Sequence, residues 1–126
     1  MAYMRARAVA YAHRWAFSRN PEYANFDLMG GDCTNFVSQC LYAGCRVMNF
    51  TPDVGWYYQS LNDRSAAWAG VQDLFTFLTA NLGPGPYGSM LPLEAAEPGD
   101  ITQAIIELGG AIHQLVHSIR QFRHGI

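Results

Sequence analysis

One cysteine has the sequence surroundings of a nucleophile. Cys33 follows Gly30, Gly31 and Asp32, and a largely apolar segment begins directly after it. Two glycines allow a tight turn into a helix, so Cys33 is predicted to lie at a helix N-terminus. There the unpaired backbone amides and the positive end of the helix dipole favour a thiolate. The same amides can stabilise the oxyanion of acyl transfer, so Asp32 and Cys33 form the predicted oxyanion and site loop.

The other two cysteines are expected to be core thiols. Cys40 falls on the apolar stripe of the same predicted helix, and Cys45 lies just past its end. On one helix, Cys33 and Cys40 would be about 10 Å apart, which is too far for a disulfide. The sequence has no Cys-x-x-Cys pair, so its spacing does not favour a zinc site. We expect neither a metal nor a cofactor.

A cysteine nucleophile that cleaves amides needs a histidine to take up the thiol proton. His13 falls within the first predicted helix, and His124 lies two residues from the end of the chain. His113 and His117 both fall on the second arm of a predicted β-hairpin. Being four residues apart, they share one face of that strand. Strand position alone therefore leaves both as candidates for the base.

Helices that could position these residues are predicted wherever apolar side chains recur every three or four positions. The predicted helices cover residues 3–17, 34–43 and 65–82. Gly44 is the predicted C-cap of the second helix. Residues 49–64 are expected to form a loop or short strands, and residues 83–88 a turn-rich connector.

The predicted hairpin consists of two apolar runs, residues 101–108 and 111–122, on either side of Gly109-Gly110. Adjacent glycines between apolar runs are typical of a hairpin turn. The alternative is a helix interrupted by the glycines, which would cost about 2 kcal/mol relative to alanine. Two strands are therefore favoured.

Composition indicates a folded domain and argues against two classes of partner. The 126 residues are 50% hydrophobic and 14% charged, which suits one domain with a core. The eight basic residues form no cluster, and the net charge is −2, which argues against nucleic acid. No apolar stretch reaches the ~18 residues of a membrane span. Residues 1–17 lack the features of a signal peptide, so export would require a leader already removed from this chain.

Residues 30–41, Gly-Gly-Asp-Cys-Thr-Asn-Phe-Val-Ser-Gln-Cys-Leu, resemble the signature of the "Putative amidase domain" family. Its members are bacterial papain-like cysteine hydrolases, related in fold to cell-wall peptidases. Further segments that resemble the family are residues 8–12, 20–23, 56–58, 65–68 and 98–101. The resemblance spans about residues 3–119.

The resemblance implies an α+β, papain-like fold within a single domain over residues 1–126. N-terminal helices, including the one that carries the nucleophile, would pack on a C-terminal antiparallel sheet. In the family, the histidine opens a short apolar strand soon after the hairpin turn. His113 matches that place better than His117, and is the favoured base. A further strand with a third polar residue normally follows, but this chain ends at Ile126, so a truncated sheet is expected and no third residue can be named.

The function implied by the resemblance is that of a cysteine amidase or peptidase. It would cleave cell-wall peptide or another bacterial peptide through a thioacyl intermediate on Cys33. Trp56, Tyr57 and Trp68 are candidates for the substrate groove, although aromatic clusters are more often part of a core. The alternative, motivated by the missing third residue, is an inactive domain of the same fold that binds peptide or glycopeptide.

Overall fold

Helices and small antiparallel sheets make up the fold, which is of the α+β class. The computed structural model describes residues 3–27, 31–106 and 112–121. The helices are α1 (Arg5–Trp15), α2 (Asp32–Cys45), α3 (Ala66–Ala69) and α4 (Val71–Ala80), with a 3-10 turn η2 (Leu93–Ala95). The strands are β1 (Tyr58–Ser60), β2 (Asp63–Arg64), β3 (Pro86–Leu91), β4 (Ile101–Ile106) and β5 (Ile112–Gln121).

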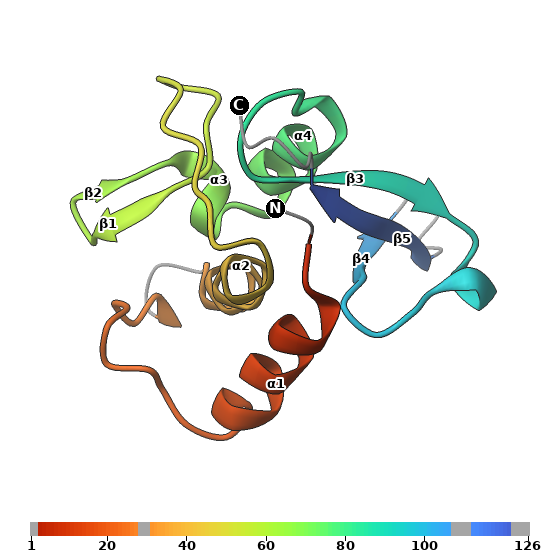
Figure 1. Cartoon of the computed structure of the whole chain (residues 1–126), viewed down its shortest axis with the longest axis horizontal. Coiled ribbons are helices and arrows are strands. Elements are labelled where there is room, and N and C mark those ends of the chain that lie inside the picture. Colours follow the sequence, from red (N-terminus) through yellow and green to blue (C-terminus); the bar gives the residue numbers. More distant parts are fainter. Residues whose placement is uncertain (1–2, 28–30, 107–111, 122–126) are drawn as a thin grey trace.

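Helices α1 and α2 pack against each other, with the β1–β2 pair on one side of α2 and the three-stranded sheet on the other (Figure 1). The ring centroids of Tyr11 in α1 and Phe36 in α2 are 6.3 Å apart. The start of α1 lies beside the end of α2, because the Met4 amide donates to the Gly44 carbonyl at 2.9 Å. The two helices predicted around residues 3–17 and 34–43 are confirmed.

The C-terminus of α2 differs from the prediction. The helix continues through Gly44 to Cys45, and its C-cap is Arg46, whose φ of 59° is left-handed. Gly44 has a different role, since a Cβ atom there would lie 2.5 Å from the ring of Tyr3. The prediction that Gly44 is the cap is therefore wrong, and the glycine instead allows the segment just before α1 to approach α2 closely.

The single helix expected over residues 65–82 is two helices, α3 and α4. Gly70 separates them with an extended backbone, at φ −100° and ψ 123°. Its amide donates to the Ala66 carbonyl at 3.0 Å, and its carbonyl accepts from the Leu74 amide at 2.8 Å. The glycine thus ends one helix and begins the next, a break that apolar periodicity does not reveal.

The two tryptophans form the centre of the hydrophobic core. Trp56 and Trp68 are both 0% exposed, and their stacked ring centroids are 5.0 Å apart. Trp56 Nε1 donates to Ser38 Oγ at 3.0 Å, and Trp68 Nε1 donates to Asn35 Oδ1 at 2.9 Å. The prediction that both tryptophans line a substrate groove is therefore wrong, because both are enclosed. Tyr57 is half-buried, and its place in a groove stays a prediction.

The three-stranded sheet has the order β3-β5-β4, so β5 is its central strand. Strands β4 and β5 pair antiparallel, as predicted, whereas Gly109-Gly110 lies outside the described residues. Strand β3 was not expected, since residues 83–88 read as a connector. It pairs with β5 from Pro86–Gln121 to Leu91–Val116. Proline is tolerated at the first position of a strand, and the tertiary pairing overrides the weak local propensity.

An ion pair ties the start of the chain to the sheet. The Asp100 carboxylate accepts from Arg5 Nη1 at 2.6 Å and from the Ile119 amide at 3.1 Å, while Arg5 Nη2 donates to the Ile119 carbonyl at 2.9 Å. Burial alone would raise the pKa of Asp100, but hydrogen bonds from the Glu97 amide, Arg5 and the Ile119 amide outweigh it and lower the pKa. Gly99, just before Asp100, has a φ of 95°, which favours glycine.

Candidate active site

Cys33 is the second residue of α2, so its predicted position at a helix N-terminus is confirmed. Its side chain is exposed. The helix start packs closely on the end of α3, because a Cβ atom on Gly31 would lie 2.6 Å from the Ala69 carbonyl oxygen. Gly31 is also the N-cap residue and supplies no side-chain cap. The first turn of α2 therefore presents an accessible thiol next to backbone amides that no side chain caps.

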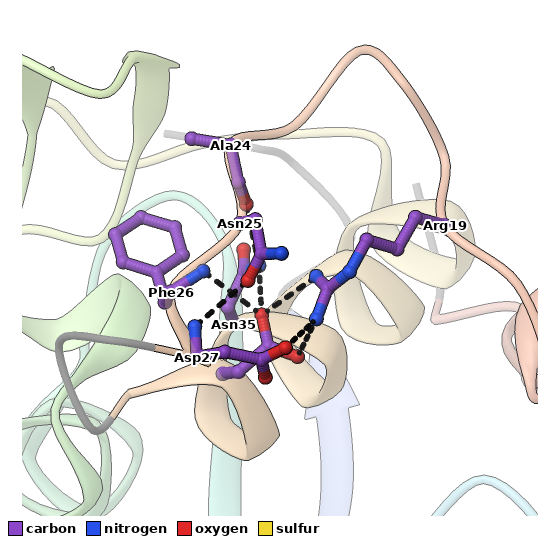
Figure 2. Close-up of polar contacts among 7 residues, drawn as sticks. Arg19, Ala24, Asn25, Phe26, Asp27 and Asn35 are labelled. Carbon is purple, nitrogen blue, oxygen red and sulfur yellow. Dashed lines mark hydrogen bonds and ion pairs between the residues drawn. The ribbon is translucent and has the colours of Figure 1, made fainter.

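Asp32 anchors the preceding loop to the helix start, and Figure 2 labels its partners Arg19, Phe26 and Asn35. Its Oδ1 accepts from the Phe26 amide at 3.1 Å and from Arg19 Nη1 at 3.0 Å, and Arg19 Nη2 donates to Asp32 Oδ2 at 2.9 Å. Arg19 Nη2 also lies 2.8 Å from Asp27 Oδ2. The hydrogen bond from Arg19 lowers the pKa of Asp32. Asp32 is thus an ionised loop anchor and not the N-cap residue.

The other two thiols are poorly suited to nucleophilic chemistry. Burial raises the pKa of Cys40 to about 12 and that of Cys45 to about 11. Cys45 is fully enclosed, as expected for a core thiol, whereas Cys40 is half-buried. Among the residues that the structure describes, no three His, Cys, Asp or Glu side chains come together as a metal-binding group.

An apolar groove, here called the α1–α2 groove, has a volume of about 260 Å³. It is lined by Tyr3, Ala8, Val9, Ala12, Phe36, Val37, Cys40, Leu41, Gly99, Asp100 and Ile101. Its residues thus come from α1 and the segment just before it, from α2, and from the start of β4 and the two residues that precede it. Cys33 lies four and seven positions before Val37 and Cys40, a spacing that places all three on one helix face. Cys33 is not among the lining residues, and this spacing puts it one helical turn before Val37 on the same face of α2.

A second pocket, of about 400 Å³, lies on the other side of Phe36, which lines both cavities. Its lining includes Arg19, Asp32 and Gln39 as well as aromatic side chains. This pocket is thus polar and charged, in contrast to the α1–α2 groove. The first turns of α2 separate two surfaces of different chemistry.

Both candidate histidines lie on β5, and the sheet register gives their backbone positions. His117 pairs with Ile101 of β4, and His113 pairs with Ile105. Ile101 belongs to the α1–α2 groove, so the backbone of His117 adjoins the groove wall. His113 lies further along the strand, beyond the part of β4 that lines the groove.

One hydrogen bond joins β5 to the helix that carries Cys33. Gln121 Nε2 donates to the Cys45 carbonyl at 3.0 Å, so the end of β5 lies at the end of α2. Helix α2 is seen nearly end-on in Figure 1, whereas β5 runs across the view. The two elements therefore meet at this end and do not run alongside each other.

The "Putative amidase domain" family model matches residues 2–123. The chain belongs to this family. It is also 34% identical over 102 residues to an uncharacterised protein of Bacillus subtilis (strain 168), YhbB. That alignment covers 79% of this chain but 31% of YhbB, so the chain spans about a third of its relative's length. No solved structure matches the chain.

Membership of the amidase-domain family indicates an amidase-like function. The match includes the Cys33 helix start, the Asp100 turn and all of β5, so the elements described here all fall within the family domain. Among the described helices of this amidase domain, none is both long and apolar enough to cross a membrane.

Sequence reasoning missed one charged residue of this amidase domain's site. Arg19 lies 13 residues before Asp32, in a segment without helical or strand periodicity, and no local pattern pairs the two. The nearest signal was Asn20-Pro21, because the residue before a proline is disfavoured in a helix, but α1 already ends at Trp15. Only the folded loop shows that Arg19 lies within reach of Asp32.

Proposed function

We propose that this amidase-domain protein hydrolyses amide bonds with Cys33 as the nucleophile. The observation that carries the proposal is the exposed position of Cys33 in the first turn of α2. Helix N-termini favour the thiolate. The family's amidase-like character and the raised pKa values of Cys40 and Cys45 support the same assignment.

His117 is proposed as the base, and His113 is the alternative. The resemblance at sequence level favours His113 because of its place after the hairpin turn. The sheet register supports His117, since its partner Ile101 lines the α1–α2 groove, to which α2 contributes Val37 and Cys40 from the helix face of Cys33.

The reaction would proceed in two stages. The imidazole takes the thiol proton of Cys33, and the sulfur adds to the amide carbonyl carbon. The tetrahedral intermediate collapses to a thioester as the C–N bond breaks, and the imidazolium gives its proton to the departing amine. Water then attacks the thioester while the imidazole accepts its proton, which releases a carboxylic acid and the free thiol.

The backbone amides of the first turn of α2 are the proposed oxyanion donors. The Asn35 amide is already bonded to the Gly31 carbonyl at 2.9 Å, so the earlier amide of Cys33 is the better candidate. A donor preorganised for the developing charge contributes about 3–4 kcal/mol in comparable sites. The proposed nucleophile and this donor are close together because the sulfur and the amide both belong to Cys33.

A bacterial peptide, such as a cell-wall peptide, is the proposed substrate. The papain-like arrangement of a cysteine helix beside an antiparallel sheet is proposed on the family resemblance and on the bond from Gln121 to the end of α2. The second candidate is an inactive domain that binds peptide or glycopeptide. It is motivated by the fact that no third polar residue has been assigned to orient the base.

Cysteine alkylation and peptide turnover test the proposal together. Iodoacetamide at pH 7.5 should label Cys33 much faster than Cys40 and Cys45, and Cys33→Ala should lose that fast phase. Peptidoglycan fragments and short peptides should be hydrolysed by the native protein and not by Cys33→Ala. Equal labelling of all three cysteines would contradict the nucleophile assignment, and binding without turnover would favour the inactive domain.

The base is tested by replacing each histidine separately. His117→Ala should lower kcat by at least about 100-fold, the usual contribution of a general base, while leaving the fold intact by circular dichroism. His113→Ala is the matched variant on the same strand and should retain most activity. The reverse result would restore His113 as the base.

A further inference from the structure

We propose that the α1–α2 groove is the subsite for the side chain next to the carbonyl attacked by Cys33, and that it selects an uncharged aliphatic side chain. The inference rests on the proposed function, because it takes Cys33 to be the nucleophile. It adds a substrate preference that follows from the groove's position, charge and size.

The position of the groove fits the reach of one amino-acid side chain. Cys33, Val37 and Cys40 follow one face of α2 at intervals of four and three residues. Val37, the first of them to line the groove, is about 6 Å from Cys33 along the helix axis. A substrate whose carbonyl carbon meets the sulfur of Cys33 can therefore place its neighbouring side chain over Val37.

The chemistry of the groove is apolar and neutral. Its accessible walls include Val9 and Ala12 of α1 and Ile101 of β4, all half-buried. The charged side chain in the lining is Asp100, which is 2% exposed. Its oxygens already accept from Arg5 and from two backbone amides. A charged substrate side chain would lose its hydration here without gaining a free partner.

The other cavity beside α2 has the opposite character. Arg19 and Asp32 line the pocket on the far side of Phe36, where charged or polar parts of a peptide would be accommodated. The ridge formed by Phe36 therefore divides an apolar surface from a polar one. Of the two, it is the α1–α2 groove that shares the helix face of Cys33, so the residue next to the scissile bond should be the apolar one.

Chloromethyl ketones that carry one amino-acid side chain test this preference directly. The thiolate of Cys33 forms a C–S bond to the reagent's methylene carbon as chloride leaves. N-acetylated leucine, alanine, aspartate and lysine chloromethyl ketones are compared, each rate being divided by that of iodoacetamide, which has no side chain. The leucine reagent should react at least about tenfold faster than the aspartate and lysine reagents.

Two substitutions in α1 localise the preference to the groove. Ala12→Phe should fill it and slow the leucine reagent by about tenfold, with little effect on iodoacetamide. Ala10→Phe is the matched control, because Ala10 is exposed and outside the lining. Val9→Asp should place a carboxylate in the groove and shift the preference toward the lysine reagent.

Similar normalised rates for all four reagents in the native protein would overturn the proposal. It would also be overturned if Ala12→Phe slowed iodoacetamide as much as the leucine reagent.

The subsite and the proposed function can fail independently of each other. Leucine preference without amide hydrolysis would retain the subsite and reject the hydrolase. Hydrolysis that depends on Cys33 without side-chain preference would reject the subsite alone.

Discussion

The loop beside the proposed nucleophile holds two negatively charged side chains and one positively charged side chain. Asp27 and Asp32 supply two carboxylates, and Arg19 pairs with both. Asp32 is directly adjacent to Cys33, so a carboxylate without its guanidinium would oppose a negative charge on the neighbouring sulfur. Arg19 is therefore expected to be a positioning residue that holds the loop and offsets this repulsion.

Replacing Arg19 with glutamine should slow the alkylation of Cys33 by iodoacetamide at pH 7.5 by about two- to fivefold, a modest effect because the charges are near water. The reagent is neutral, so its rate reports the thiolate and not steering of the reagent. Adding Asp32→Asn to that variant should restore part of the rate. Arg14→Gln is the control, and a native rate in Arg19→Gln would exclude the electrostatic role.

At the scale of the elements, a buried polar network locks α2 to the aromatic core. Ser38 Oγ accepts from Trp56 Nε1 at 3.0 Å and donates to the Trp68 carbonyl at 2.8 Å. Ser38 is 0% exposed, so each of these groups would otherwise be buried without a partner. The network thereby fixes the helix that carries Cys33 relative to α3.

Removing this hydroxyl should destabilise the fold measurably. Ser38→Ala leaves the indole N–H of Trp56 without its acceptor, and the expected loss is about 1–3 kcal/mol of unfolding free energy. Urea denaturation followed by tryptophan fluorescence would measure it. Ser60→Ala, at an exposed position of β1, is the matched control and should change little. If Ser38→Ala lost no more unfolding free energy than Ser60→Ala, water or another group must replace the hydroxyl as the partner of Trp56.

Sequence periodicity predicted the elements that have one clear apolar face, and it missed features that depend on distant partners. The helix start at Cys33 followed from glycines and an apolar stripe in one short segment. Strand β3 was missed because Pro86 and Gly88 have low strand propensity, and it forms only by pairing with β5. The burial of Trp56 and Trp68 likewise depends on acceptors from α2, whose orientation no local pattern reveals.

At the scale of the whole molecule, Arg5 and Asp100 connect parts of the chain that are 95 residues apart. The pair joins the first helix to the central strand through Ile119, and Tyr3 Oη donates to the Gly99 carbonyl at 2.7 Å beside it. The α1–α2 groove is bounded by these same elements. Its width should therefore depend on this connection.

The stability contributed by Asp100 should depend on pH with a defined sign. Its pKa is lowered in the folded state, so the stabilisation is present above the unfolded carboxyl pKa of about 3.9 and is lost as the pH falls through the folded value. At pH 7, Asp100→Asn should lose about 1–3 kcal/mol, and the difference should shrink toward pH 3. The exposed Glu94→Gln is the control, and a pH-independent difference would contradict the argument.

The strand order β3-β5-β4 also has a consequence for synthesis on the ribosome. Helix α2, with the proposed nucleophile, emerges early, whereas β5 is translated after β3 and β4 and must insert between them. Until it does, the Cys33 thiol lacks both candidate imidazoles of β5, and the hydrogen-bonding edge of β3 stays unmatched. The proposed amide hydrolysis would therefore become possible only after β5 has inserted.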